Sequence, residues 1–341
     1  MIELACPACL GHLQAGTDAL RCRDCAKSYR CLRGIPDLRT IEDAYLPNAE
    51  DWAFALRLDQ EYDRLDFRGL LDLYYDLSPE VAPDQRARQI GHILSAPGRA
   101  AAWVQALGPD LPAGPWLDLG CGSGSFLAAQ GDRDIVGIDV AMRWLLVARK
   151  RLDEEGLSQI RLVCGNAEQL PFRDCSFAAV VAGDVIEHVA DQRATLAEAY
   201  RALKPGGRLF LATPNRLSLT PEPHVGVWGV GFLPRRWMSG YVHLVRRADF
   251  RAIRTLSYAG WTRLLRESLF GGASISCPAL PAGDLEAMGG VKRRLAFAYN
   301  WLTLSWIGQR LMRGVGPLFH ILASRGEENP TSPGPRPATR P

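Results

Sequence analysis

Four cysteines near the start of the chain have the residue types and the spacing of a metal site. Cys6 and Cys9 form one Cys-x2-Cys pair, and Cys22 and Cys25 form a second pair after 12 intervening residues. Four thiolates in this arrangement close a tetrahedral zinc site and leave no coordination position for a substrate. We therefore predict a structural zinc ion in a small zinc ribbon that spans residues 1–40.

A second group of residues has the pattern of a nucleoside site. Gly120, Gly122 and Gly124 directly follow the apolar run PWLDL. Glycines that follow a strand let the backbone approach a ligand closely. Asp139 ends the next apolar run, DIVGIDV, where a carboxylate can accept hydrogen bonds from both ribose hydroxyls of a nucleoside. The pairing of these two features predicts a nucleoside cofactor.

Alternating strands and helices must position these residues. Apolar runs at 114–120, 134–140, 160–165, 177–185 and 208–214 are typical of strands, and amphipathic stretches separate them. This alternation predicts a Rossmann-like, doubly wound α/β sheet that is mostly parallel. The expected parts are a helical linker or lid (41–100), the main domain (101–277) with a substrate-facing insertion (214–257), a hydrophobic helical segment (278–325) and a disordered tail (326–341).

Five motifs between residues 115 and 215 resemble, in the same order, those of class I S-adenosylmethionine-dependent methyltransferases. They are DLGCGSGSF, GIDV, GNAEQLPF, GDVIEHV and LKPGGRLFLATPN. The resemblance is closest to the subgroup that includes quinone-ring methyltransferases. It implies transfer of a methyl group from S-adenosylmethionine to an oxygen, nitrogen or carbon atom of an acceptor.

The resemblance also implies a role for each matching position. The glycine turn would hold the methionine part of the cofactor, with Asp118 fixing its amino group, and Asp139 would bind the ribose. Asn166 and Ala167 would border the adenine. Asn166 stands where the family more often has Asp, and its amide oxygen would accept from the adenine amino group. Asp184 would close the site beside the sulfonium.

Two histidines are candidates for the general base. A phenol or hydroxyl acceptor must lose its proton, and a positioned base typically contributes about 10²–10⁴-fold. His188 lies in the motif GDVIEHV, and His224 lies in the insertion. In the alternative interpretation, His188 and the neighbouring Glu187 only shape the pocket wall, and His224 is an incidental loop residue.

Several classes of methyl acceptor fit the sequence. The zinc ribbon resembles modules of the tRNA-methyltransferase partner type, and a related ribbon precedes bacterial guanine-N1 rRNA methyltransferases. An RNA acceptor is therefore one alternative. The ribbon has few basic residues, which favours a small-molecule or lipid-linked acceptor. A noncatalytic scaffold that binds the cofactor is a further alternative, against which the intact cofactor motifs argue.

Charge is distributed unevenly along the chain. Its net charge is only +3, yet residues 201–270 hold 12 basic and 3 acidic side chains, and residues 41–100 hold 12 acidic and 6 basic ones. Arginines among aromatic residues in the insertion suit a phosphate, a nucleic-acid strand or an anionic headgroup. They are equally explained by ion pairs with the acidic stretch.

The segment LAFAYNWLTLSWIGQ (295–309) is the longest hydrophobic candidate. Its 15 uncharged residues fall short of the ~20 that span a bilayer, and basic residues flank it on both sides. Either it lies in a membrane interface, with peripheral contact through 291–325, or it is buried against the main domain. The N-terminal MIELACPACL lacks a basic segment followed by a long apolar run, so we expect a cytoplasmic location, peripheral to the inner face of the membrane in the first case.

Overall fold

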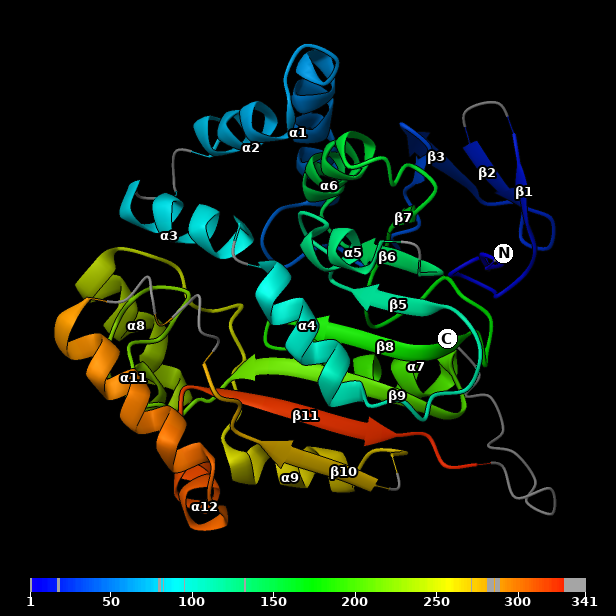
Figure 1. Cartoon of the computed structure of the whole chain (residues 1–341). Coiled ribbons are helices and arrows are strands. Elements are labelled where there is room, and N and C mark those ends of the chain that lie inside the picture. Colours follow the sequence, from blue (N-terminus) through cyan, green and yellow to red (C-terminus); the bar gives the residue numbers. More distant parts are fainter. Residues whose placement is uncertain are drawn as a thin grey trace.

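A seven-stranded sheet runs through the middle of the molecule (Figure 1). The computed structural model describes residues 2–327 except 17, 18, 79, 80, 82, 95, 132, 271, 281–284 and 286–288. The strands are β5 (Trp116–Leu119), β6 (Ile135–Asp139), β7 (Arg161–Cys164), β8 (Phe177–Gly183), β9 (Leu203–Pro214), β10 (Gly272–Ser276) and β11 (Leu318–Ser324). Their order is β10-β11-β9-β8-β5-β6-β7, and the pairs from β9 to β7 are parallel. The prediction of a doubly wound, mostly parallel sheet is confirmed.

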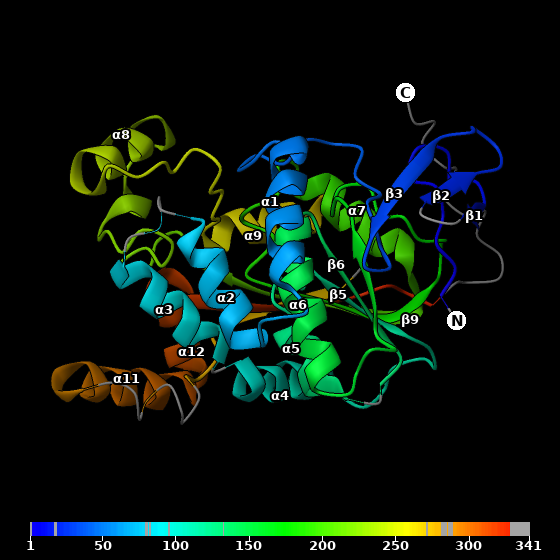
Figure 2. The same cartoon turned by 90° about the horizontal axis from the view of Figure 1, so that it is seen from above.

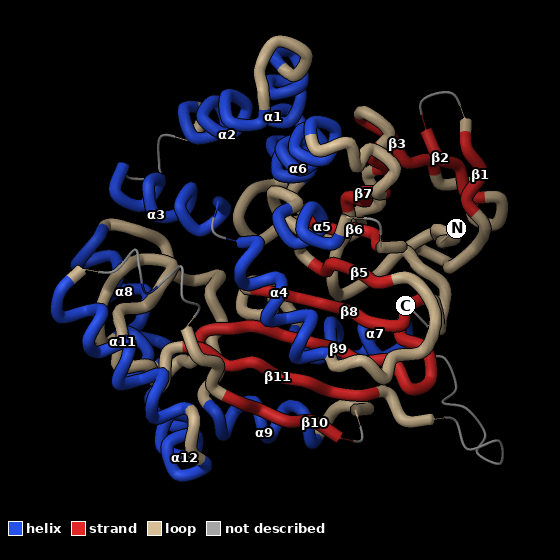
Figure 3. Tube along the Cα trace, viewed as in Figure 1, coloured by secondary structure: helices blue, strands red, loops and turns tan. Residues whose placement is uncertain are grey.

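Helices cover both faces of this sheet (Figures 2 and 3). One face carries α4 (Ala96–Leu107), α5 (Ser125–Gln130) and α6 (Met142–Glu154), with α1 (Asn48–Glu61) and α2 (Phe67–Asp76) packed on α6; the other carries α7 (Gln192–Ala202) and α9 (Tyr258–Arg266). Successive side chains of a strand point to opposite faces. Leu117 and Val180 therefore join the core beneath α7 and α9, and Trp116 and Val181 join the core beneath α4 to α6.

The N-terminal ribbon is part of the main core. Its strands β1 (Leu13–Ala15), β2 (Ala19–Cys22), β3 (Ser28–Leu32) and β4 (Ile35–Pro36) form an antiparallel sheet. Cys6 and Tyr29 lie in the same hydrophobic cluster as Phe172 of the main domain. At the end of the ribbon, the backbone N–H of Leu38 donates to the carbonyl of Cys164 at 2.7 Å. The ribbon therefore extends the edge of the sheet beside β7.

A buried carboxylate fastens the ribbon's exit to two helices. Asp51, in the first turn of α1, is fully buried. Its oxygens accept hydrogen bonds from Arg39 at 2.7 Å and from Arg143 at 2.6 Å. The backbone N–H of Met142, the first residue of α6, donates to the same carboxylate at 2.9 Å. The start of α6 is thus held by a segment that leads out of the ribbon.

Two expected boundaries are wrong. Helix α4 begins at Ala96 and runs to Leu107, across the predicted boundary between 41–100 and 101–277. The segment 278–325 is not a purely helical attachment, because β11 pairs with both β9 and β10 inside the main sheet. Its sequence LFHILAS carried the signal, since Phe319, Ile321 and Ala323 alternate with less buried residues.

Four further helices and a short 3-10 turn complete the described chain. They are α3 (Pro83–Leu94), α8 (Arg235–Arg246) with the turn η1 (Val230–Phe232) in the insertion, α11 (Gly290–Thr303) and α12 (Trp306–Val315). Among the described helices, none is long and apolar enough to cross a membrane. Nearly all of the predicted disordered tail, residues 328–341, lies outside the described residues.

Candidate functional site

The glycine turn after β5 brings open backbone to the edge of the sheet. Gly120, Gly122 and Gly124 have φ angles of 75°, 48° and 73°, in the left-handed region that side chains disfavour. A Cβ on Gly120 would lie 2.1 Å from a methyl carbon of Val185, so a larger residue does not fit there. A Cβ on Gly122 would meet nothing within 4 Å, which leaves that part of the turn open for a ligand.

Asp118 supplies a buried carboxyl group directly before this turn. It is 3% exposed, and its Oδ2 atom has no hydrogen-bond partner among the described residues. Burial, together with the charge of Asp139, raises the pKa of Asp118 well above its usual range. A buried acceptor without a donor is costly. This oxygen therefore fits the cationic amino group of a ligand that lies in the glycine turn.

Asp139 lies where the nucleoside prediction placed it, at the end of β6. One of its oxygens accepts from the backbone N–H of Gly122 at 2.9 Å and the other from Ala141 at 2.9 Å. Each carboxylate oxygen can accept a second hydrogen bond. Asp139 therefore holds the glycine turn against β6 and still has acceptor capacity for two hydroxyl groups.

The role expected for Asn166 is not supported by its contacts. Its side chain is 4% exposed, and its Oδ1 accepts from the backbone N–H groups of Thr40 and Ile41 at 3.0 and 3.1 Å. Its Nδ2 donates to the Ile41 carbonyl at 3.1 Å. Because both ends of the amide are engaged, Asn166 fixes the linker after the ribbon and offers no free acceptor to an adenine. The neighbouring Ala167 is partly exposed, and its place beside the adenine stays a prediction.

Asp184 follows β8 with a backbone conformation that is rare for a residue with a side chain. Its φ is 56°, and its N–H donates to the Ala212 carbonyl at 2.8 Å. Non-glycine residues in this region cost free energy and concentrate at functional sites. This strained turn leads directly into the segment that holds His188.

The two candidate histidines lie in contact, although 36 positions separate them in the sequence. The Nε2 atoms of His188 and His224 are 3.1 Å apart. His224 Nδ1 pairs with Glu222 at 2.6 Å, its Nε2 lies 3.7 Å from the buried Glu187 carboxylate, and His188 Nδ1 bonds to the Tyr45 hydroxyl. All four imidazole nitrogens therefore have protein partners. Sequence reasoning missed Tyr45 and Glu222, because only the tertiary fold brings Tyr45 to His188.

The pKa values of the two imidazoles are shifted in opposite directions. Burial lowers the pKa of His224, but the Glu187 and Glu222 carboxylates outweigh it and raise the value to about 10. Burial and the neighbouring His224 lower the pKa of His188 to about 3. At neutral pH, His224 is therefore cationic and donates from Nε2, and the neutral His188 donates from Nδ1 to Tyr45. This series of hydrogen bonds ends at the Tyr45 hydroxyl, which is a donor on a side chain that is 48% exposed.

This arrangement does not make either histidine a direct base in this conformation. It presents a hydrogen-bond donor backed by a positive charge, which suits an ionised oxygen on an acceptor. The ligand atoms of Glu187, His188 and His224 also lie within 4.8 Å of one another, close enough to share a cation. The hydrogen bonds above account for the imidazole nitrogens without one.

The four ribbon cysteines do come together. All four Sγ atoms lie within 4.8 Å of one another, with Cys6 to Cys25 at 3.6 Å and Cys9 to Cys22 at 3.5 Å. Tetrahedral Zn–S bonds of ~2.3 Å imply Sγ–Sγ distances of about 3.8 Å. The cluster can therefore hold zinc. It lies at the opposite end of the molecule from α8 and the insertion (Figures 1 and 2).

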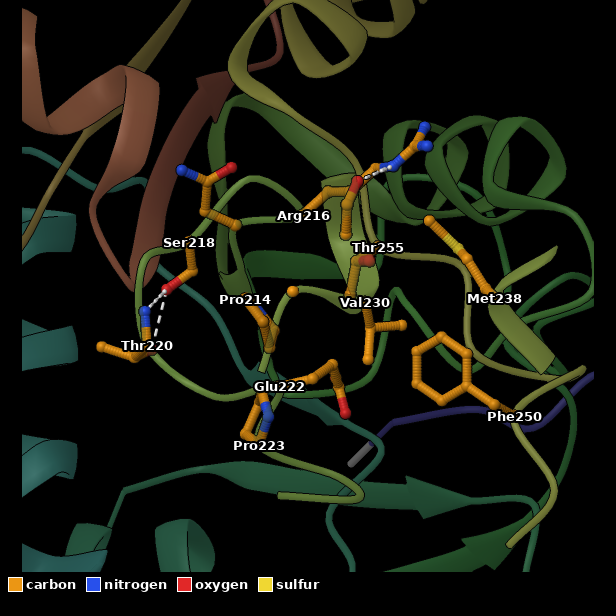
Figure 4. Close-up of a pocket in the computed structure, with 13 residues that line it drawn as sticks. Pro214, Arg216, Ser218, Thr220, Glu222, Pro223, Val230, Met238, Phe250 and Thr255 are labelled. Carbon is orange, nitrogen blue, oxygen red and sulfur yellow. Dashed lines mark hydrogen bonds between the residues drawn. The ribbon is translucent and has the colours of Figure 1, made fainter. Parts of the chain in front are cut away.

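A small pocket lies inside the insertion (Figure 4), and its lining residue Glu222 pairs with His224. Its volume is about 20 Å³, and Glu222 contributes to its wall. Arg216 stabilises this wall by donating to the carbonyls of Gly231 and Leu233 at 3.0 and 2.9 Å. Such a volume accommodates a single water molecule. The pocket is therefore part of the insertion's packing and is too small for an acceptor.

Comparison with known proteins finds matches to the central part of the chain. Residues 117–211 match a family model described as a methyltransferase domain. A ubiquinone biosynthesis O-methyltransferase of Idiomarina loihiensis is 35% identical over 129 residues, which cover 37% of this chain and 50% of that protein. A demethylmenaquinone methyltransferase of Listeria welshimeri is 32% identical over 117 residues, 33% of this chain and 47% of that protein. The chain thus spans about half the length of these curated relatives.

Among solved structures, phosphoethanolamine N-methyltransferase 2 of Haemonchus contortus has a TM-score of 0.45 at 17% identity. That alignment covers 67% of this chain and 52% of the other. The family match includes Asp118, the glycine turn, Asp139, Asn166 and His188. The ribbon, Tyr45 and His224 lie outside it.

The raised pKa of His224 gives a testable pH dependence of stability. Its folded-state value of about 10 exceeds the ordinary value near 6.5, so the charge stabilises the fold fully below pH ~6.5 and this contribution is lost as the pH rises towards 10. In urea unfolding, we expect the stability difference between wild type and His224→Gln to shrink by at least about 1.4 kcal/mol, the equivalent of one pKa unit, over that range. His243→Gln, at an exposed position on α8, is the control. A constant difference for His224→Gln would refute the assignment.

Proposed function

We propose that this protein is an S-adenosylmethionine-dependent methyltransferase that acts on a small-molecule or lipid-linked acceptor. The observation that carries the proposal is the buried oxygen of Asp118, which has no hydrogen-bond partner in the described part of the chain and lies beside a turn of left-handed glycines. A carboxylate there would hold the amino group of the cofactor's methionine part. Asp139 would bind the ribose, and Ala167 would border the adenine. The match of residues 117–211 to a methyltransferase domain supports this assignment.

The chain's own contribution to methyl transfer is positioning. The bound cofactor supplies a methyl group on a sulfonium, which is already activated for displacement by a nucleophile held in line at about 3–3.5 Å. The Tyr45 hydroxyl, oriented by His188 and backed by the cationic His224, would bind an ionised oxygen of the acceptor. This favours a phenolate or another acidic hydroxyl over a basic amine. The curated relatives named for ubiquinone and menaquinone methylation are consistent with an acceptor of this class.

The alternatives have less support. The resemblance of the ribbon to modules of RNA-modifying enzymes suggested RNA, but the ribbon lies at the opposite end of the molecule from the insertion that borders the histidine pair (Figure 1). A noncatalytic scaffold would have no use for the polar chain from Glu222 to Tyr45. Both alternatives are outcomes of the experiments below.

Cofactor binding is the first test. By isothermal titration, we expect wild type to bind S-adenosylmethionine and S-adenosylhomocysteine, and Asp139→Ala to bind about 10²-fold more weakly, because it loses two charge-assisted hydrogen bonds. Asp134→Ala, an exposed aspartate just before the same strand, is the matched control. Absence of binding by wild type would remove the enzyme interpretation.

Methyl transfer is the second test. With a labelled methyl donor and a cell extract, we expect label in the small-molecule or lipid fraction. Tyr45→Phe should transfer about 10²-fold more slowly with unchanged cofactor affinity, since it removes one donor to a charged oxygen. Tyr241→Phe is the control, because it removes a hydroxyl that, among the residues the structure describes, bonds to the Trp228 carbonyl alone. Label in RNA would favour the RNA alternative, and cofactor binding without any labelled product would favour a scaffold.

We also propose that Cys6, Cys9, Cys22 and Cys25 bind a structural zinc ion. The purified protein should contain one zinc per chain by elemental analysis. Cys9→Ser should lose the metal and unfold at a lower temperature, because the ribbon shares its core with the main domain. Cys31→Ser, which changes a cysteine outside the cluster, should keep both. Equal zinc loss in the two variants would contradict the assignment.

A further inference from the structure

Helix α11 packs Tyr299 and Leu302 against the main core but exposes several other large apolar side chains. Leu295, Phe297 and Trp301 are exposed, whereas the buried positions are Ala296 and Thr303. A surface helix of a globular domain normally directs its apolar stripe towards the core. In α11, much of this stripe faces solvent instead.

Helix α12 shows the same pattern. Trp306, Ile307 and Leu311 are exposed, and its buried positions are Gly308 and Met312. Together the two helices present a continuous stretch of chain with large apolar residues that are 56% to 83% exposed, namely Val291, Leu295, Phe297, Trp301, Leu304, Trp306, Ile307 and Leu311. We call these side chains the outer surface of α11 and α12. An exposed apolar set of this size marks an interaction site.

Polar contacts on the inner side fix this orientation. Asn300 accepts from the backbone N–H of Leu280 at 2.7 Å and donates to its carbonyl at 3.0 Å. Gln309 accepts from the N–H of Cys277 at 2.9 Å and donates to its carbonyl at 2.8 Å. Rotating either helix to bury its apolar side would break these paired bonds. The alternative of a helix buried against the main domain therefore holds for Tyr299 and Leu302 but not for the exposed apolar residues.

The charges beside the outer surface have one sign. Lys292, Arg293, Arg294 and Arg310 are exposed, and the sequence from 289 to 316 contains no acidic residue. Three of these cations lie in or beside the first turn of α11, where the positive end of the helix dipole disfavours them. Helix stability does not explain their position, but an anionic partner would.

The outer surface lies at the end of the molecule that holds the candidate site. In Figures 1 and 2, α11 lies at the same end as α8, which is also the end to which the parallel strands point. In doubly wound sheets, ligands bind outside this edge. Helix α8 exposes Trp237 and Leu244 together with several arginines, a composition like that of α11.

We propose that the outer surface of α11 and α12 binds an anionic lipid bilayer, with both helices lying in the plane of the interface. Helix α11 has 14 residues, about 21 Å, which is shorter than the ~30 Å hydrocarbon core. Exposed tryptophans and flanking cations are what an interfacial helix places at the boundary of headgroups and acyl chains. This inference does not depend on the methyltransferase proposal, although it would bring the candidate site to lipid-linked acceptors.

Vesicle sedimentation tests the apolar part of the proposal. The full chain should sediment with vesicles of phosphatidylcholine containing about one-third phosphatidylglycerol, and less so as salt rises. The triple variant Trp301→Gln, Trp306→Gln and Leu311→Gln should lower the partition coefficient at least about tenfold. These side chains are exposed, so the fold should persist. Leu56→Gln, at an exposed position on α1, should bind like wild type.

Replacement of two arginines tests the basic part of the proposal, by comparing vesicles with and without anionic lipid. Arg294→Gln with Arg310→Gln should weaken binding to the anionic vesicles by about fivefold per cation removed. Binding to pure phosphatidylcholine vesicles should change little in this double variant. Loss on both kinds of vesicle would point to misfolding, which thermal unfolding of the variant would reveal.

Two outcomes would overturn the proposal. One is that wild type fails to sediment, or that the triple variant sediments equally well. The other is a concentration-dependent dimer of wild type that the triple variant lacks, without vesicle binding, which would assign the outer surface to a second copy of the chain. Titration of the triple variant with S-adenosylmethionine separates this proposal from the previous one, because cofactor affinity should be unchanged.

Discussion

The carboxylate of Asp51 joins three parts of the molecule. They are the ribbon, the first helix and the edge of the sheet that carries the candidate cofactor-binding residues. The carboxylate is fully buried, and it bonds to Arg39 from the ribbon's exit and to Arg143 and the N–H of Met142 at the start of α6. Buried charges persist only when they are paired and hydrogen-bonded. Asp139 lies three positions before Met142. The position of the predicted ribose-binding carboxylate therefore depends on a contact with a segment more than eighty residues earlier.

The segment that leaves the ribbon follows this edge for about fifteen residues. Leu38 pairs with the end of β7, Thr40 and Ile41 bond to Asn166, and Tyr45 reaches His188. The ribbon core anchors one end of the segment, and Asp51 anchors the other. A closed metal site is suited to this task, because it holds a small module rigid where its own core is too small to do so. The ribbon thus contributes to the candidate site by positioning this linker.

The two ends of the molecule are built from different parts of the chain. The ribbon occupies one end, and the insertion, α8 and the two C-terminal helices occupy the other (Figure 2). β11 returns the chain from those helices to the main sheet, between β9 and the edge strand β10. Because β11 pairs with β9 from Leu318 to Ser324 and with β10 from His320 to Ser324, α12 is tied firmly to the sheet. The outer surface of α11 and α12 is therefore held in a fixed relation to the site.

Features that depend on local geometry could be predicted from the amino-acid sequence. These features are the strand and helix periods, the glycine turn, the cysteine spacing, and Asp118 and Asp139 near the ends of their strands. Each reflects backbone constraints over a few residues, and the structure has all of them. Tertiary structure alone decided the rest. The contact of Asn166 with Ile41 spans 125 positions, and that of His188 with Tyr45 spans 143. Side chains this far apart interact only after the chain folds, and whether the apolar side of α11 faces the core or solvent is set by its polar anchors at Asn300 and Gln309.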